Sequence, residues 1–130
     1  MKKQGFTLLE LMMVVSIIAI LLVVAIPSFQ AQLAQSQRTE AMVYLARLAN
    51  AQEHYYAESL SYTANMEHLG GSADPWILPG GDYSVDATAA NSEGFVLKAT
   101  ALGNQKRIDS DCQELTLNEL GQGLPASCWN

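Results

Sequence analysis

The chain has 130 residues, which allows one compact domain once its apolar amino-terminal segment is set aside. Seven Lys and Arg stand against thirteen Asp and Glu, so the formal net charge is −6. This balance argues against generic nucleic-acid binding, which needs clustered cations for the backbone phosphates. The one basic pair after the apolar segment, Lys106-Arg107, is closely followed by Asp109 and Asp111, and we interpret it as a solvated loop.

The amino-terminal segment is long enough to span a membrane. From Phe6 to Ile26 its only polar residues are Thr7, Glu10 and Ser16. At a rise of about 1.5 Å per residue, this helix would be roughly 31 Å long. Lys2 and Lys3 precede it, and the next cation is Arg38, so the positive-inside rule leaves the amino terminus in the cytoplasm and exports the rest.

A cleaved secretory signal is the alternative interpretation, with its best cleavage site at Val23-Val24-Ala25. The length of the run, the Pro27 just beyond that site and the charge of Glu10 within the run all argue against it. A charged residue in a membrane helix is costly and therefore suggests a function.

A single long helix is predicted to extend to about Tyr56. Pro27 removes one helical hydrogen bond and is expected to bend or loosen the helix, which then resumes. The second half is amphipathic, as expected for a helix that packs on a domain with one face. Its predicted apolar stripe consists of Ala34, Ala41, Tyr44, Leu45, Leu48 and Tyr55.

The remaining chain predicts an α+β fold. Residues 57–82 contain Gly70-Gly71, Asp74-Pro75 and Pro79-Gly80-Gly81, which indicate an irregular connection. Residues 83–130 alternate in three stretches that begin near Tyr83, Phe95 and Leu115, and Asn91–Gly94 and Gly103-Asn104 supply turns. We therefore expect three or four antiparallel strands against the helix.

Cys112 and Cys128 are the only cysteines. An even count beyond a membrane segment suggests a disulfide in an oxidising compartment, and two buried free thiols are the alternative. Their spacing offers zinc no ligand set, and His54 and His68 belong to no metal motif. We predict no metal, no cofactor and no enzymatic site. Trp76 and Trp129 are interpreted as core residues in preference to ligand anchors.

The run Lys2-Lys3-Gln4-Gly5-Phe6-Thr7-Leu8-Leu9-Glu10 resembles the type III signal of type IV pilins and pseudopilins. The resemblance implies a leader at residues 1–5, cleavage between Gly5 and Phe6 by prepilin peptidase, and N-methylation of Phe6. It also implies a filament-core helix at residues 6–26 and an exported globular domain at residues 27–130. Glu10 is expected to dock with the Phe6 amine of a neighbouring subunit.

The body is similar to that of minor type IV pilins. The similar stretches are Glu53-His54-Tyr55-Tyr56, Tyr62-Thr63, Leu69-Gly70, Tyr83-Ser84-Val85, residues 112–118 and Cys128-Trp129. The resemblance implies a pilin fold with a Cys112–Cys128 disulfide loop at its carboxyl end. Trp76-Ile77-Leu78 has no counterpart that we can place.

The expected function is that of a minor pilus subunit, held in the inner membrane with its body in the periplasm and then assembled with other pilins into a surface filament. The pilus assembly machinery is the further partner, and adhesion, twitching motility and DNA uptake are the associated roles. A pseudopilin of type II secretion and a membrane-tethered periplasmic binding module are the alternatives. Asp109, Asp111 and Glu114 are too few for a pseudopilin-like calcium site, and the acidic body lacks the positive stripe of a DNA-uptake pilin.

Overall fold

The computed structural model describes residues 1 and 4–130. Lys2 and Lys3 of the predicted leader lie outside the described residues. The chain divides into two compact units, Met1–Leu33 and Ala34–Asn130, which share one long helix, α1. The elements are α1 Leu8–Ser59, η1 Met66–Leu69, β1 Trp76–Ile77, β2 Tyr83–Ala90, β3 Phe95–Ala101, α2 Gly103–Ile108, η2 Ser110–Cys112, β4 Glu114–Asn118, β5 Gly123–Leu124 and η3 Ala126–Cys128.

Helix α1 continues through Pro27 and ends at Ser59, three residues beyond the expected end. Its next residue, Leu60, has a positive φ of 56° and donates its N–H to the carbonyl of Tyr56 at 2.8 Å. A left-handed residue directly after the last turn is the usual way for a helix to stop. Leucine holds this conformation less easily than glycine, which explains why the end of α1 is difficult to predict.

The antiparallel sheet is confirmed, in the order β1-β2-β3-β4-β5. Residues 83–90, 95–101 and 114–118 form its three longer strands, and the turn expected at Asn91–Gly94 joins β2 to β3. The short edge strands β1 and β5 extend the expected three or four strands to five. Strands of two residues carry no readable alternation, so β1 was hidden in the connection expected at residues 57–82.

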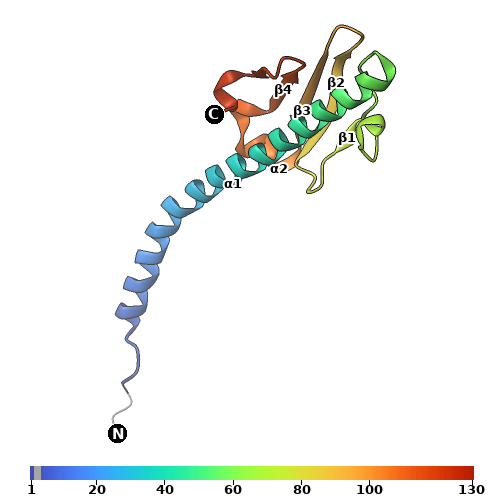
Figure 1. Ribbon diagram of the computed structural model, residues 1–130. Coiled ribbons are helices and arrows are strands. Elements are labelled where there is room, and N and C mark those ends of the chain that lie inside the picture. The colour runs from blue at the N-terminus through green and yellow to red at the C-terminus, as the bar shows by residue number, and fades with distance from the viewer. Residues whose placement is uncertain (2–3) are drawn as a thin grey trace. The chain divides into compact units, whose positions relative to one another are not determined.

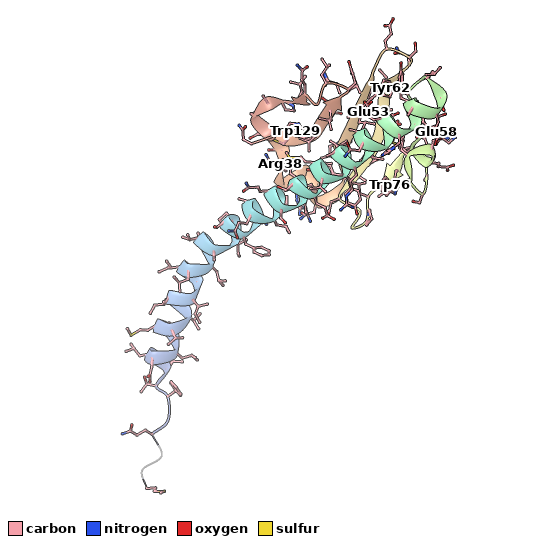
Figure 2. The ribbon with its side chains drawn as sticks, viewed as in Figure 1. Arg38, Glu53, Glu58, Tyr62, Trp76 and Trp129 are labelled. Atoms are coloured by element: carbon pink, nitrogen blue, oxygen red, sulfur yellow. A yellow bond between two sulfur atoms is a disulfide. The ribbon has the colours of Figure 1, made fainter. Side chains whose placement is uncertain are left out.

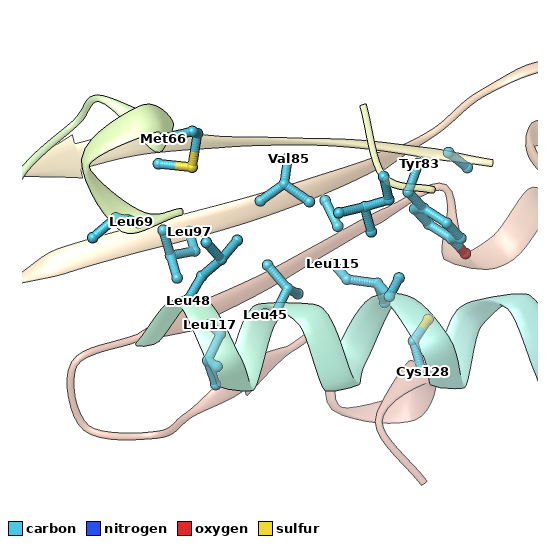
Figure 3. Packing of buried hydrophobic residues seen from close by; sticks show 14 of the residues in the cluster. Leu45, Leu48, Met66, Leu69, Tyr83, Val85, Leu97, Leu115, Leu117 and Cys128 are labelled. Carbon is cyan, nitrogen blue, oxygen red and sulfur yellow. The ribbon is translucent and has the colours of Figure 1, made fainter. Parts of the chain in front are cut away.

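The core of the body lies between the sheet and the second half of α1 (Figures 1 and 3). In β3 every second side chain is buried, from Phe95 to Ala101, as the alternation predicted. The stripe on α1 is also confirmed: Ala34, Ala41, Leu45 and Leu48 are buried, and Tyr44 and Tyr55 are partly buried. Figure 3 shows Leu45 and Leu48 pointing toward Val85 and Leu97 of the sheet, and Leu115 and Leu117 belong to the same buried cluster.

The predicted disulfide joins Cys112 to Cys128, and both residues are buried. It connects the end of η2 to the end of η3, so the segment that holds β4 and β5 is closed into a loop. Closing a loop of this size stabilises a folded domain by about 3 kcal/mol in the chain-entropy model.

Candidate functional site

The segment that the sequence assigns to processing is open to solvent. Gly5 and Phe6 precede the first helical residue, Leu8, and the Phe6 side chain is 86% exposed. Gln4, Gly5, Phe6 and Glu10 line one shallow hollow of about 210 Å³. The structure therefore brings the three residues predicted for processing and docking to one accessible place at the start of α1.

Thr7 explains why α1 begins where it does. Its hydroxyl accepts the backbone N–H of Glu10 at 3.2 Å, and its carbonyl accepts the N–H of Leu11 at 3.2 Å. A threonine followed three residues later by glutamate is the sequence pattern of a capping box. Glu10 also lies in the first turn, where the helix dipole favours an anion. Glu10 is thus compatible with the local helix even though its neighbours are apolar.

The first unit exposes a continuous apolar surface. Every described residue from Phe6 to Gln32 is exposed, and the most hydrophobic 18-residue window of α1 has a mean hydropathy of 3.0 with none of its residues buried. Ser16 does not interrupt this surface, because its hydroxyl donates to the carbonyl of Met12 at 2.7 Å. Within the described residues, α1 is the one helix long and apolar enough to cross a membrane. Such a surface needs a lipid or protein environment.

A buried polar network holds α2 against α1 in the body. The Arg38 guanidinium donates to both carboxylate oxygens of Asp109, at 2.9 and 3.0 Å, and to the carbonyl of Cys128 at 3.5 Å. Asp109 is only 7% exposed. Two parallel bonds of this kind are the strong geometry for arginine and carboxylate. The ion pair therefore connects α1, α2 and the end of the disulfide loop.

Gln105 extends the network to the sheet. Its amide nitrogen lies 2.9 Å from the Ala34 carbonyl, 2.9 Å from the Tyr83 hydroxyl and 3.1 Å from an Asp109 oxygen. Burial raises the pKa of the Tyr83 phenol, and the nearby Asp109 raises it further, while the bond to Gln105 and the charge of Arg38 lower it. The phenol thus stays neutral in the folded body.

Sequence patterns missed this network because its partners are distant in the chain. Arg38 and Asp109 are 71 residues apart, and no local pattern pairs them: Arg38 was considered as the first cation after the apolar run, and Asp109 as a member of an insufficient calcium set. The expected turn at Gly103-Asn104 in fact opens α2, whose residue Gln105 is fully buried. Gly103 still provides the turn, since its φ is +50°. A glutamine within a polar stretch gives no signal that its amide will be buried.

The other residues singled out in the sequence take structural positions. Trp76 packs edge-on against Tyr44 with ring centres 5.6 Å apart, and Trp129 donates its indole N–H to the Leu124 carbonyl at 3.3 Å. Both tryptophans are partly buried against the core. Lys106 and Arg107 are exposed on α2. Among the described residues, no group of three or more His, Cys, Asp or Glu is placed to hold a metal ion.

Comparisons with known proteins identify the family. Residues 27–116 match the family model described as "Type IV minor pilin ComP, DNA uptake sequence receptor", and residues 1–26 match the prokaryotic N-terminal methylation motif. The chain belongs to the type IV pilins, in the minor-pilin family. The predicted family is therefore confirmed, and so is the function as a type IV pilus subunit.

Relatives cover the chain to different extents. The fimbrial protein EcpC of Eikenella corrodens is 31% identical over 98% of this pilin and 92% of its own length. The major pilin PilA of Myxococcus xanthus is 37% identical over 71% of this pilin, which spans only 41% of that relative. A solved type IV pilin from Shewanella oneidensis is 30% identical, covers 75% of this pilin and 98% of its own chain, and has a TM-score of 0.52.

The exposed apolar half of α1 agrees with the way in which this family assembles. Type IV pilins assemble with other pilin subunits into a surface filament from a membrane-anchored precursor. In this pilin, the segment matched by the methylation motif contains the hollow formed by Gln4, Gly5, Phe6 and Glu10 and the apolar surface as far as Ile26.

Proposed function

We propose that this pilin is cut after Gly5 by prepilin peptidase, N-methylated at Phe6 and packed into a filament through the apolar half of α1. The observation that carries the proposal is the continuous exposed surface from Phe6 to Gln32, which begins at an accessible Gly5-Phe6 junction. Before assembly the same surface lies in the inner membrane, and the body lies in the periplasm. The filament then replaces lipid contacts with contacts to other helices.

Glu10 selects the register of each incoming subunit in this proposal. Within the apolar core of a filament, a carboxylate is costly unless a cation compensates it. Cleavage after Gly5 creates such a cation, the amine of Phe6, one helical turn before Glu10. A staggered neighbour can then place its own Phe6 amine beside Glu10, and only the correct stagger neutralises both charges.

Cleavage at this junction is tested by replacing Gly5 with leucine. The bulky side chain should block the peptidase. Full-length precursor should then accumulate in the inner membrane, and the variant should be missing from sheared filaments. Gln4→Leu provides the matched control, because it adds a similar side chain one residue away from the cut. Normal processing of Gly5→Leu would refute the assigned junction. An intact amino terminus in wild-type protein that stays in the membrane would favour the tethered binding module.

The description of the matched family favours a second function, recognition of DNA during uptake. The cations of the body that could reach phosphates are few: Arg47, Lys106 and Arg107 are exposed, and Lys98 is partly buried 3.5 Å from Glu114. Three phosphate contacts would give a shallow salt dependence, with a slope of about −3 in log K against log salt. Generic binding is therefore expected to be weak.

Filter binding to duplex DNA over a salt series tests this second function. The double variant Lys106→Gln/Arg107→Gln should lower the affinity and reduce the slope by about 2. An unchanged slope would show that α2 does not contact DNA, and the absence of any binding by the wild type would remove this function.

A further inference from the structure

A hollow on the body, separate from the amino-terminal segment, combines aromatic rings, one carboxylate and an apolar base. Its volume is about 260 Å³, and it is lined by Ala51, His54, Tyr55, Glu58, His68 and Leu69. The first four residues follow one another at helical spacing on one face of α1, and the last two come from η1. Figure 2 labels Glu58 near the end of α1.

The rings form an ordered wall. Tyr55 and His68 are stacked with ring centres 5.6 Å apart and planes only 8° from parallel. The Nδ1 atom of His68 lies 3.2 Å from the Thr63 hydroxyl, and that hydroxyl accepts the N–H of Asn65 at 3.1 Å. Thr63 is itself held by Gln52, whose amide bonds both its N–H and its carbonyl. The His68 ring therefore contacts a hydroxyl that two buried bonds between Gln52 and Thr63 hold in place.

The charges around the hollow favour a cation. The residues that line the hollow include one carboxylate, Glu58, and no Lys or Arg, and Glu67 directly precedes His68 in η1. Glu58 is exposed and forms no ion pair within the part of the chain that the structure describes. The faces of aromatic rings attract cations as well. A phosphate or carboxylate ligand would be repelled by the same groups.

We propose that this hollow binds an alkylammonium group, such as the side chain of lysine or the end of a polyamine. The aliphatic stem would lie on Ala51 and Leu69, while the ammonium group would face the Tyr55–His68 wall and the Glu58 carboxylate. A metal ion is the less suitable cation, because no group of three or more ligating side chains is placed to hold one among the described residues. The inference is independent of processing and filament assembly.

The test is an NMR titration of the full-length chain in nonionic detergent, observed at the imidazole signals of His54 and His68. The probe is Nα-acetyl-lysine amide, and Nα,Nε-diacetyl-lysine amide is the control without the charge. A saturable shift is expected with the first compound alone. Tyr55→Leu keeps an apolar side chain but removes the ring, and it should weaken binding. No saturable shift, or an equal response to both compounds, would overturn the proposal.

Two variants that each remove one carboxylate distinguish binding in the hollow from attraction to the negative charge of the whole body. Glu58→Gln should weaken binding about threefold, as expected for one exposed ion pair. Glu93→Gln removes the same charge from the turn between β2 and β3, outside the hollow, and should leave the affinity unchanged. Equal weakening by both variants would contradict a localised site.

Repeating the titration with 1,5-diaminopentane identifies the source of the alkylammonium group. Tighter binding of the diamine indicates a free polyamine, and tighter binding of the lysine derivative indicates a partner protein.

Discussion

Gly123 shows how one residue limits the carboxyl-terminal region. A Cβ atom at this position would lie 2.3 Å from the ring of Trp129, which therefore packs directly on the backbone of β5. Gly123→Ala should destabilise the body by about 1–3 kcal/mol through overpacking. Chemical denaturation followed by tryptophan fluorescence measures this cost.

Gly94→Ala is the matched control, since its new Cβ would meet only the movable end of the Glu119 side chain. That change should alter the free energy of unfolding by less than about 0.5 kcal/mol. Equal stabilities of the two variants would show that Trp129 does not depend on close packing over Gly123.

Tyr83 gives the body a defined response to alkaline pH. Because burial raises the pKa of the folded phenol, its stabilising contribution is complete below the unfolded pKa of about 10 and is lost as the pH rises through the folded pKa. Above pH 10 the free energy of unfolding should fall less steeply in Tyr83→Phe than in the wild type, by up to about 1.4 kcal/mol per pH unit. Urea denaturation at several pH values measures the slope. An identical slope in the variant would exclude Tyr83 as the titrating group.

Among the elements, α2 depends on α1 through the pair Arg38–Asp109. Arg38→Met leaves the Asp109 carboxylate buried without its cation, with the Gln105 amide as its remaining donor, at a cost of about 3 kcal/mol. The double variant Arg38→Met/Asp109→Leu removes both charges and should be more stable than the single variant. Denaturation of the three proteins gives the comparison, and a double variant no more stable than Arg38→Met would contradict an essential ion pair.

The elements also show which parts of the fold the sequence can predict. The alternation in β3 and the apolar stripe of α1 come from burial on one face, so each is visible as a local period. The edge strands β1 and β5 have two residues each and leave no period. Contacts such as those of Gln105 with Ala34 and Tyr83 depend on tertiary folding, and local patterns do not contain them.

One candidate site was also visible as a local sequence pattern, and the other depends on tertiary folding. The residues Gly5, Phe6 and Glu10 lie within six positions, so a local motif was enough to find them. The hollow beside Glu58 is lined by residues of both α1 and η1, and the sequence showed only that His54 and His68 belong to no metal motif. Only the fold shows that they line the same surface.

For the whole molecule, Glu10 is predicted to act in assembly and not in membrane insertion. Glu10→Ala removes the cost of a charge in an apolar run, so the variant should accumulate normally in the membrane. It should enter filaments poorly, because the attraction to the neighbouring Phe6 amine is lost. Quantification of the variant beside wild type in membranes and in sheared filaments measures both steps. Equal incorporation for equal membrane pools would contradict the docking role.

The central claim is that the apolar half of α1 becomes a filament core after cleavage at Gly5. Mass spectrometry of the amino-terminal peptide from sheared, purified filaments tests it most directly. The account predicts a peptide of this chain that begins at Phe6 and carries one N-methyl group. A peptide that begins at Met1, or the absence of this chain from filaments while it accumulates in the membrane, would contradict the account.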